Sequence, residues 1–235
     1  MHHDPMADPT ELPRPGAVLF DLDGTLVDTV EDRIEAWARV FDEAGIPVER
    51  RRLGPLIGVD GKRLAREVAA IAGMTLDDDR TEAIDKRCGE IYETLNHDPR
   101  PLPGVRELVA AMEARGVPWA IATSSRKEQV GTSVDALGLG HEPTIVDGSQ
   151  VKHAKPEPDL LLLGAKKLKV DPARCWYIGD STWDIAAAIA AGMIPIGVTA
   201  GSAVTAEVLE GAGAALVVAT LEALVAAVER DGSAG

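Results

Sequence analysis

The sequence is poor in cysteine and in aromatic residues. Cys88 and Cys175 are the only cysteines among 235 residues. Two cysteines are too few for a disulfide framework, and these two are not spaced as metal ligands. Their scarcity favours a reducing, cytoplasmic location. Aromatic residues make up only 3% of the chain, so the core must be packed mainly with Ala, Val, Leu and Ile.

The chain also lacks an excess of positive charge. It has 24 Lys and Arg against 38 Asp and Glu, a formal net charge of −14. This balance argues against a nucleic-acid partner, which requires a basic face to neutralise phosphates. It does not exclude a small phosphorylated substrate, because one metal ion and one lysine can reverse the local field.

Long uninterrupted apolar runs are missing as well. Residues 1–15 are polar and rich in proline, unlike a signal peptide, and we expect a disordered leader there. Residues 185–204 are nearly uncharged and long enough to span a bilayer, but Gly192 and Pro195 divide them. A helix, a turn and a short strand explain that segment better, so we expect no membrane partner. The sequence leaves a monomer and a homodimer equally open.

The first half of the chain begins with one strand and continues with helices. Residues 18–20 are apolar and end in the polar cluster 21–25, which is typical of a buried strand with polar groups at its carboxyl end. Thr29 and Asp32 then resemble a capping box at the start of a helix. Residues 50–96 read as helical throughout, with breaks near residues 58–61 and 73–75.

The second half alternates between helices and strands. A proline-rich stretch at residues 98–104 separates it from the first half. Ser125, with Glu128, resembles a helix cap. Strands are predicted at residues 119–122, 176–178, 194–198 and 215–218. Strands separated by helices predict an α/β protein with a doubly wound parallel sheet. We expect this core to comprise residues 16–28 and 101–235, with an all-helical cap domain, residues 29–100, inserted into it.

Polar side chains follow three of the predicted strands. In an open parallel sheet, ligands bind outside the carboxyl ends of the strands. The residues expected there are Asp21, Asp23, Thr123, Ser124, Asp180 and Asp184, with Lys155 in a nearby loop. Four carboxylates in one crevice repel one another unless a cation lies among them. Hard oxygen ligands without His or Cys indicate Mg²⁺.

Four segments, in order along the chain, resemble the motifs of the haloacid dehalogenase superfamily. They are DLDGTLVD at residues 21–28, Thr123, KPEPD at residues 155–159, and GDSTWD at residues 179–184. The resemblance implies a Rossmann-like core with a helical cap of the C1 type. It is nearest to the phosphoglycolate phosphatase-like and β-phosphoglucomutase-like branch. The implied activity is Mg²⁺-dependent hydrolysis of a small phosphate monoester.

The resemblance also implies a role for each site residue. Asp21 would be the nucleophile and Asp23 the general acid and base, whose pKa should lie above that of metal-bound Asp21. Thr123 and Lys155 complete the catalytic set. The metal ligands would be Asp21, the Asp23 carbonyl, Asp180 and, as an outer ligand or as the partner of Lys155, Asp184. The substrate contacts would be Gly24, Ser124 and Lys62.

Other activities of the superfamily remain as alternatives. Dehalogenases lack the second aspartate of the first motif, so Asp23 argues against them. Phosphonatases use a cap lysine, which Lys62 could supply, but the first motif is phosphatase-like. The β-phosphoglucomutases carry Glu where Gly179 stands and His where Arg33 stands, and both departures favour simple hydrolysis. A non-catalytic regulatory module is the remaining alternative. Lys62 and Trp183 could equally be substrate contacts or ordinary surface and packing residues.

Overall fold

The structure, a computed structural model, describes residues 8–230. Among these residues six strands form one parallel sheet in the order β3-β2-β1-β4-β5-β6. The strands are β1 (Ala17–Phe20), β2 (Trp119–Ala122), β3 (Thr144–Val146), β4 (Cys175–Gly179), β5 (Ile194–Val198) and β6 (Leu216–Val218). The prediction of a doubly wound parallel sheet is confirmed, although β3 was not foreseen.

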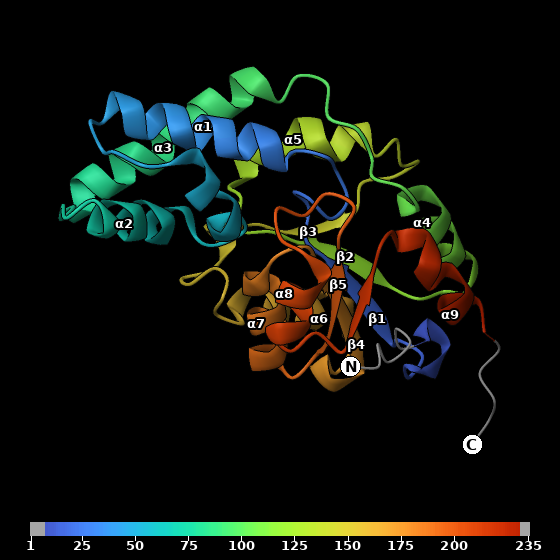
Figure 1. Ribbon diagram of the computed structural model, residues 1–235. Coiled ribbons are helices and arrows are strands. Elements are labelled where there is room, and N and C mark those ends of the chain that lie inside the picture. The colour runs from blue at the N-terminus through green and yellow to red at the C-terminus, as the bar shows by residue number, and fades with distance from the viewer. Residues whose placement is uncertain (1–7, 231–235) are drawn as a thin grey trace.

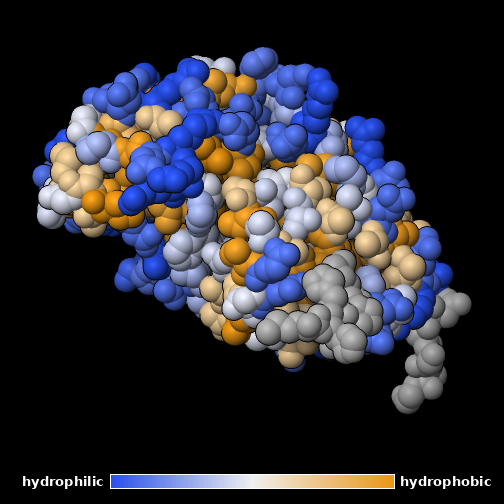
Figure 2. Space-filling model, in the orientation of Figure 1, coloured by the Kyte–Doolittle hydropathy of each residue, from blue (hydrophilic) through white to orange (hydrophobic). Residues whose placement is uncertain are grey.

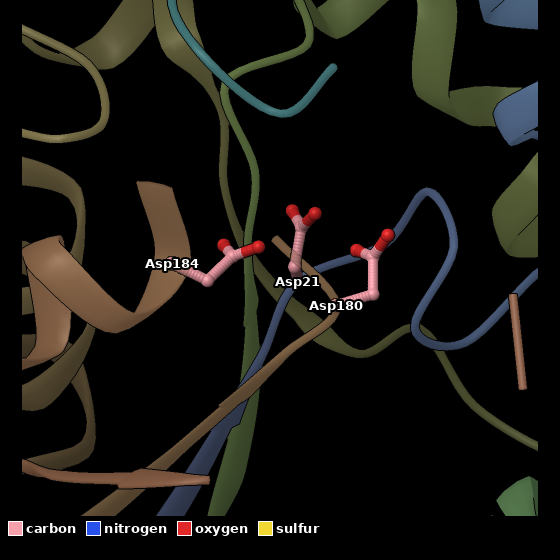
Figure 3. A group of neighbouring side chains, drawn as sticks. All are labelled: Asp21, Asp180 and Asp184. Atoms are coloured by element: carbon pink, nitrogen blue, oxygen red, sulfur yellow. The ribbon is translucent and has the colours of Figure 1, made fainter. Parts of the chain in front are cut away.

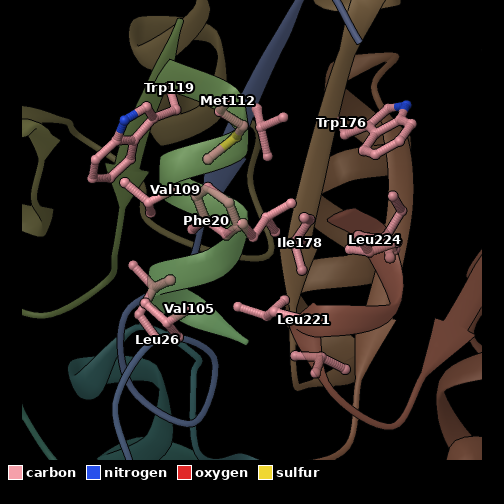
Figure 4. Close-up of a cluster of buried hydrophobic side chains, with 14 of the residues drawn as sticks. Phe20, Leu26, Val105, Val109, Met112, Trp119, Trp176, Ile178, Leu221 and Leu224 are labelled. Carbon is pink, nitrogen blue, oxygen red and sulfur yellow. The ribbon is translucent and has the colours of Figure 1, made fainter. Parts of the chain in front are cut away.

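Helices cover both faces of the sheet (Figure 1). They are α4 (Val105–Ala114), α5 (Lys127–Ala136), α6 (Asp159–Leu168), α7 (Thr182–Ala191), α8 (Ala206–Gly211) and α9 (Val225–Glu229). Successive residues of a strand point to opposite faces. Leu19 of β1 accordingly packs in the cluster formed with α6 and α7. Phe20 packs with α4 and α9 in the larger cluster on the other face (Figure 4).

Three further helices lie together beyond the carboxyl edge of the sheet. They are α1 (Val30–Glu43), α2 (Gly61–Ile71) and α3 (Asp78–Leu95), joined through the short 3₁₀ turns η2 (Arg50–Arg52) and η3 (Gly54–Leu56). We refer to α1–α3 and their connections as the cap. Their buried side chains, among them Phe41, Leu64 and Tyr92, form a hydrophobic cluster of their own. This separate cluster supports the proposal that residues 29–100 form a cap domain.

Two chain segments connect the cap with the sheet, and they run side by side. Val27 and Pro101 form an antiparallel bridge. The Asp28 amide donates to the carbonyl of Arg100 at 2.9 Å, and the Leu102 amide donates to the carbonyl of Leu26 at 3.0 Å. The two connections are therefore a short two-stranded ribbon.

The described part of the predicted leader is ordered. It contains the 3₁₀ turn η1 (Pro9–Glu11), and Leu12 packs against the main hydrophobic cluster. Trp176 Nε1 donates to the Pro13 carbonyl at 3.0 Å. The prediction of disorder over residues 1–15 is therefore wrong for residues 8–15, because the sheet side of the molecule offers them apolar and polar partners. Residues 1–7 lie outside the described residues.

The remaining 3₁₀ turns are η4 (Gly148–Gln150), η5 (Pro172–Arg174) and η6 (Leu221–Leu224).

None of the helices within residues 8–230 is long and apolar enough to cross a membrane. The face in Figure 2 carries many hydrophilic residues with smaller hydrophobic areas between them.

Candidate active site

The site lies where the carboxyl ends of β1, β2 and β4 meet. β1 stands at the centre of the sheet, where the strand order reverses, and such a position opens a crevice between diverging connections. Asp21 follows β1, Thr123 follows β2 and Asp180 follows β4, while Asp184 lies in the first turn of α7. The fold therefore brings together residues from distant parts of the chain.

Three buried aspartates converge at this edge (Figure 3). One carboxylate oxygen from each of Asp21, Asp180 and Asp184 lies within 4.8 Å of the others. Burial raises the pKa of Asp21 to about 7. The positive charge of Lys155 lowers this pKa, and the negative charge of Asp184 raises it further. Burial and the charges of Asp184 and Asp21 raise the pKa of Asp180 well above its usual value. Both carboxylates would be stabilised by a cation between them.

Lys155 supplies one positive charge to this cluster. Its side chain is 0% exposed, and its Nζ lies 2.7 Å from Asp21 Oδ1 and 2.8 Å from Asp184 Oδ1. Burial alone would lower the pKa of Lys155, but the charges of Asp184 and Asp21 raise it above its ordinary value. Lys155 is therefore a fixed cation beside Asp21.

Asp184 is fully engaged by protein groups. Its Oδ1 has Lys155 Nζ at 2.8 Å and the Tyr177 hydroxyl at 3.0 Å, and its Oδ2 has the Ser181 amide at 3.0 Å and Ser181 Oγ at 2.6 Å. An ionised carboxylate offers about four acceptor positions, so all are used. Among the described residues, the Asp180 carboxylate by contrast accepts a single hydrogen bond, from Thr25 Oγ1 at 3.2 Å. The carboxylate oxygens of Asp21 and Asp180 therefore fit the coordination of a hard cation. Asp184 serves instead as the ion-pair partner of Lys155.

Asp23 turns toward the cap rather than toward this cluster. Its Oδ1 accepts from Thr29 Oγ1 at 2.6 Å and from the Tyr92 hydroxyl at 2.9 Å. Its Oδ2 accepts from Arg33 at 2.9 Å and from Ser125 Oγ at 2.8 Å. Burial by itself would raise the pKa of Asp23, but the Arg33 charge and the hydrogen bonds from Thr29, Arg33 and Ser125 bring it below the ordinary value. Without a bound cation, the pKa of Asp23 therefore lies below that of Asp21. This is the reverse of the order predicted for Asp23 and metal-bound Asp21.

Sequence reasoning missed this set of partners. Thr29 and Ser125 were predicted as helix caps, but α1 and α5 begin without a side-chain cap. Both hydroxyls donate to Asp23, a strong charge-assisted bond, and neither accepts from an amide in the first turn of its helix. The only signal in the sequence was Arg33, noted as a departure from the mutases.

A cavity of about 550 Å³ separates the cap from the sheet edge. Asp21, Asp23, Thr123, Ser124 and Lys155 line it from below. Thr123 Oγ1 accepts from the Ser125 amide at 3.1 Å. The buried Ser124 Oγ has no hydrogen-bond partner among the described residues, so it is available to a ligand.

Two of the predicted substrate contacts have other partners. Gly24 is not among the cavity-lining residues, and a Cβ at this position would overlap the Asp180 carboxylate. Lys62 lines the cavity from the cap, but its Nζ lies 2.6 Å from Glu82 in α3. Trp183 contacts the cap, because its Nε1 donates to the Pro55 carbonyl at 2.9 Å.

Polar contacts also join the cap to the sheet side around the cavity. Arg126, just before α5, lies 2.9 Å from Glu82 and forms a second ion pair with Asp85. The Asp60 amide donates to the Lys155 carbonyl at 3.1 Å. Charged and polar groups therefore help to hold the cap over the cavity, together with Trp183, which packs on the cap's hydrophobic cluster.

Comparison with known proteins places the chain among the hydrolases. Residues 15–192 match the family described as haloacid dehalogenase-like hydrolase, and the chain belongs to this family. It is 31% identical to the "Probable phosphatase IndB" of Dickeya dadantii, over 89% of this chain and 92% of the relative. It is 33% identical to the "N-acetylmuramic acid 6-phosphate phosphatase" of Pseudomonas aeruginosa, over 72% and 75% of the two chains.

A solved structure agrees with this relationship. A hydrolase from Pseudomonas syringae superposes with a TM-score of 0.85 at 32% identity, covering 89% of this chain and 96% of that chain. The predicted superfamily membership is thus confirmed. The chain is an enzyme of the haloacid dehalogenase-like phosphatases, which act on small phosphate substrates.

The Lys155–Asp184 pair makes a first prediction about stability. Asp184→Asn keeps the size of the side chain but leaves the buried ammonium with one counterion fewer. Breaking a buried ion pair costs about 3–5 kcal/mol, and urea unfolding should show a loss of this order. The control is Glu67→Gln, which breaks the exposed pair with Arg63 (2.8 Å) and should cost under about 1 kcal/mol. Equal small losses would show that Lys155 does not depend on Asp184.

Proposed function

We propose that the protein is a Mg²⁺-dependent phosphatase that hydrolyses a small phosphate monoester through an aspartyl phosphate on Asp21. The observation that carries this proposal is the position of Asp21. It lies at the end of β1 on the cavity wall, beside the buried Lys155 and within reach of Asp180. The substrate would be phosphoglycolate or a related small organic or sugar phosphate.

The residues that would hold Mg²⁺ are Asp21, Asp180 and the main-chain carbonyl of Asp23. Asp184 would not touch the ion, and would act by holding Lys155 beside Asp21. When bound, the ion would neutralise charge on the phosphoryl oxygens and on Asp21. Two carboxylates with free acceptor positions and raised pKa values support this assignment.

Asp21 would attack phosphorus, forming the carboxyl O–P bond as the bond to the leaving oxygen breaks. Splitting hydrolysis in this way replaces one difficult step by two easier ones. Lys155 would hold Asp21 in place and neutralise the phosphoryl charge, while Thr123 and Ser124 would donate to a phosphoryl oxygen. Asp23 would give a proton to the leaving oxygen and later take one from the water that cleaves the aspartyl phosphate.

One contact favours hydrolysis over a mutase reaction. A Cβ at Gly179 would overlap the Asp184 side chain. The glutamate of β-phosphoglucomutases would therefore not fit at this position unless Asp184 and its bonds to Lys155 were displaced. A non-catalytic module is disfavoured because Asp21, Asp23, Lys155 and Asp180 are all present at the cavity or beside it.

The nucleophile makes the second prediction. Asp21→Asn should lower hydrolysis of p-nitrophenyl phosphate in Mg²⁺ by at least about 10³-fold, because the amide cannot form the covalent intermediate. The measurement is p-nitrophenol release, with the far-UV circular dichroism of the variant as the check on folding. Turnover by Asp21→Asn close to that of the wild type, or full wild-type turnover in EDTA, would end the proposal.

The metal makes the third prediction. Asp180→Ala should raise the Mg²⁺ concentration for half-maximal activity by more than about tenfold, because a charged ligand is lost. Asp184→Ala should raise it less than Asp180→Ala does, because Asp184 would act on the ion only indirectly, through Lys155. Calorimetric titration with Mg²⁺ measures both affinities directly. Unchanged affinity in Asp180→Ala would place the ion elsewhere.

Lys62 makes the fourth prediction. We propose that this cap lysine contacts the part of the substrate remote from the phosphate, leaving Glu82 to do so. For an ester with a second anionic group, Lys62→Ala should lower kcat/KM by about 10–100-fold, the equivalent of one charged hydrogen bond. Hydrolysis of p-nitrophenyl phosphate, which lacks such a group, should change little. Equal losses on both substrates would assign Lys62 to the cap surface.

A further inference from the structure

The Asp23 carboxylate has no acceptor position left. Thr29 and Tyr92 donate to Oδ1, and Arg33 and Ser125 donate to Oδ2, at 2.6–2.9 Å. Four donors fill the roughly four acceptor positions of a carboxylate. A group that exchanges a proton with a leaving oxygen or with water needs one of these positions free. In the described state Asp23 therefore cannot perform its proposed role.

The two oxygens of Asp23 differ in their access to substrate. Asp23, Arg33 and Ser125 all line the cavity, whereas Thr29 and Tyr92 do not. Oδ2, which Arg33 and Ser125 bind, is thus the oxygen on the cavity side. A ligand reaches Asp23 by taking the place of one of these two donors.

Arg33 is the donor that comes from the cap and from helix α1. One terminal nitrogen donates both to Asp23 Oδ2 and to Ser125 Oγ at 2.8 Å, and the other donates to Gln129 Oε1 at 3.1 Å. The guanidinium carbon lies 3.4 Å from the centre of the Tyr92 ring. The side chain is only about one-tenth exposed, so its charge is balanced mainly by groups of the protein.

A buried guanidinium that leaves its carboxylate needs another acceptor, because an unpaired buried charge is strongly unfavourable. Arg33 lines the cavity, so a substrate bound there can supply such an acceptor. A hydroxyl or carboxylate oxygen on the leaving group, close to the ester oxygen, would accept from Arg33 as Asp23 turns to the ester. An unsubstituted alkyl leaving group has no oxygen that could accept a hydrogen bond from Arg33.

We propose that Arg33 is a positioning residue that blocks Asp23 in the resting enzyme and is drawn away by the substrate. The enzyme would thereby select phosphate esters whose leaving group carries an oxygen acceptor next to the ester carbon, such as polyol or hydroxy-acid phosphates. This inference rests on the proposed phosphatase function and names its substrate class.

The test uses pairs of esters that differ only in the acceptor oxygens. 2-Phosphoglycolate is compared with ethyl phosphate, and glycerol 3-phosphate with propyl phosphate. For each pair kcat and KM are measured in wild type and in Arg33→Met with saturating Mg²⁺. The intrinsic reactivity of each ester is the same for every variant, so a change in the ratio of kcat/KM values reports the enzyme alone.

In wild type the oxygenated ester of at least one pair should be preferred. Arg33→Met should reduce that preference by about 10–100-fold, the range for one hydrogen bond to a charged group. The loss should fall more heavily on the oxygenated ester, so the ratio of kcat/KM values within each pair is the readout. The matched control is Arg66→Met, which removes a cap arginine that lines the same cavity but pairs with Asp78; its ratio should not change.

A second variant guards against poor folding of Arg33→Met. Gln129→Ala keeps the guanidinium, so the preference for the oxygenated ester should persist, whereas the loss of one anchor makes Arg33 easier to displace and should raise kcat/KM for both esters of a pair. An unchanged ratio or equal losses on both esters in Arg33→Met, or a fall in kcat/KM on both esters in Gln129→Ala, would overturn the inference while leaving the phosphatase function intact. Failure of the wild type on every ester, p-nitrophenyl phosphate included, would instead overturn the proposed function.

Discussion

An ammonium group shielded from solvent organises the carboxyl edge of the sheet. Lys155 is fully buried, so its charge must be balanced by the protein, and Asp21 and Asp184 provide that balance. Asp184 in turn binds Ser181 at the start of α7 and the Tyr177 hydroxyl from β4. One charge therefore ties together the loop before α6, the end of β1 and the first turn of α7. The orientation of Asp21 follows from this network.

Much of the fold could be predicted from the sequence. Short apolar runs that end in polar clusters identify buried strands and the side chains at their carboxyl ends, which is why Asp21, Asp180 and Thr123 were expected in one crevice. β3 escaped notice because it has three residues and two of them are only partly buried. The ordered segment over residues 8–15 was missed because its partners, Trp176 and Arg230, lie more than 160 positions away.

The detailed environment of the site could not be predicted in this way. Thr29 and Ser125 each satisfy a local capping pattern, yet a carboxylate outside that pattern takes their hydroxyls. Lys62 finds Glu82 only because α2 packs beside α3. The local sequence shows which hydrogen bonds and ion pairs a side chain can form. Its actual partner depends on the packing of segments that are far apart in the sequence. Asp23 shows this most clearly, since its four partners come from three segments: the start of α1, helix α3 and the loop before α5.

The ribbon at Val27 and Pro101 has a thermodynamic consequence. Because its two segments are hydrogen-bonded to each other, they bend together and restrict the cap to a hinge-like rotation. The cap keeps its own hydrophobic cluster, on which Trp183 packs, and ion pairs such as Arg126 with Glu82 cross between the cap and the sheet side. Moving the cap away from the sheet would break these ion pairs, whose attraction is screened by salt. The balance between cap positions therefore depends on ionic strength.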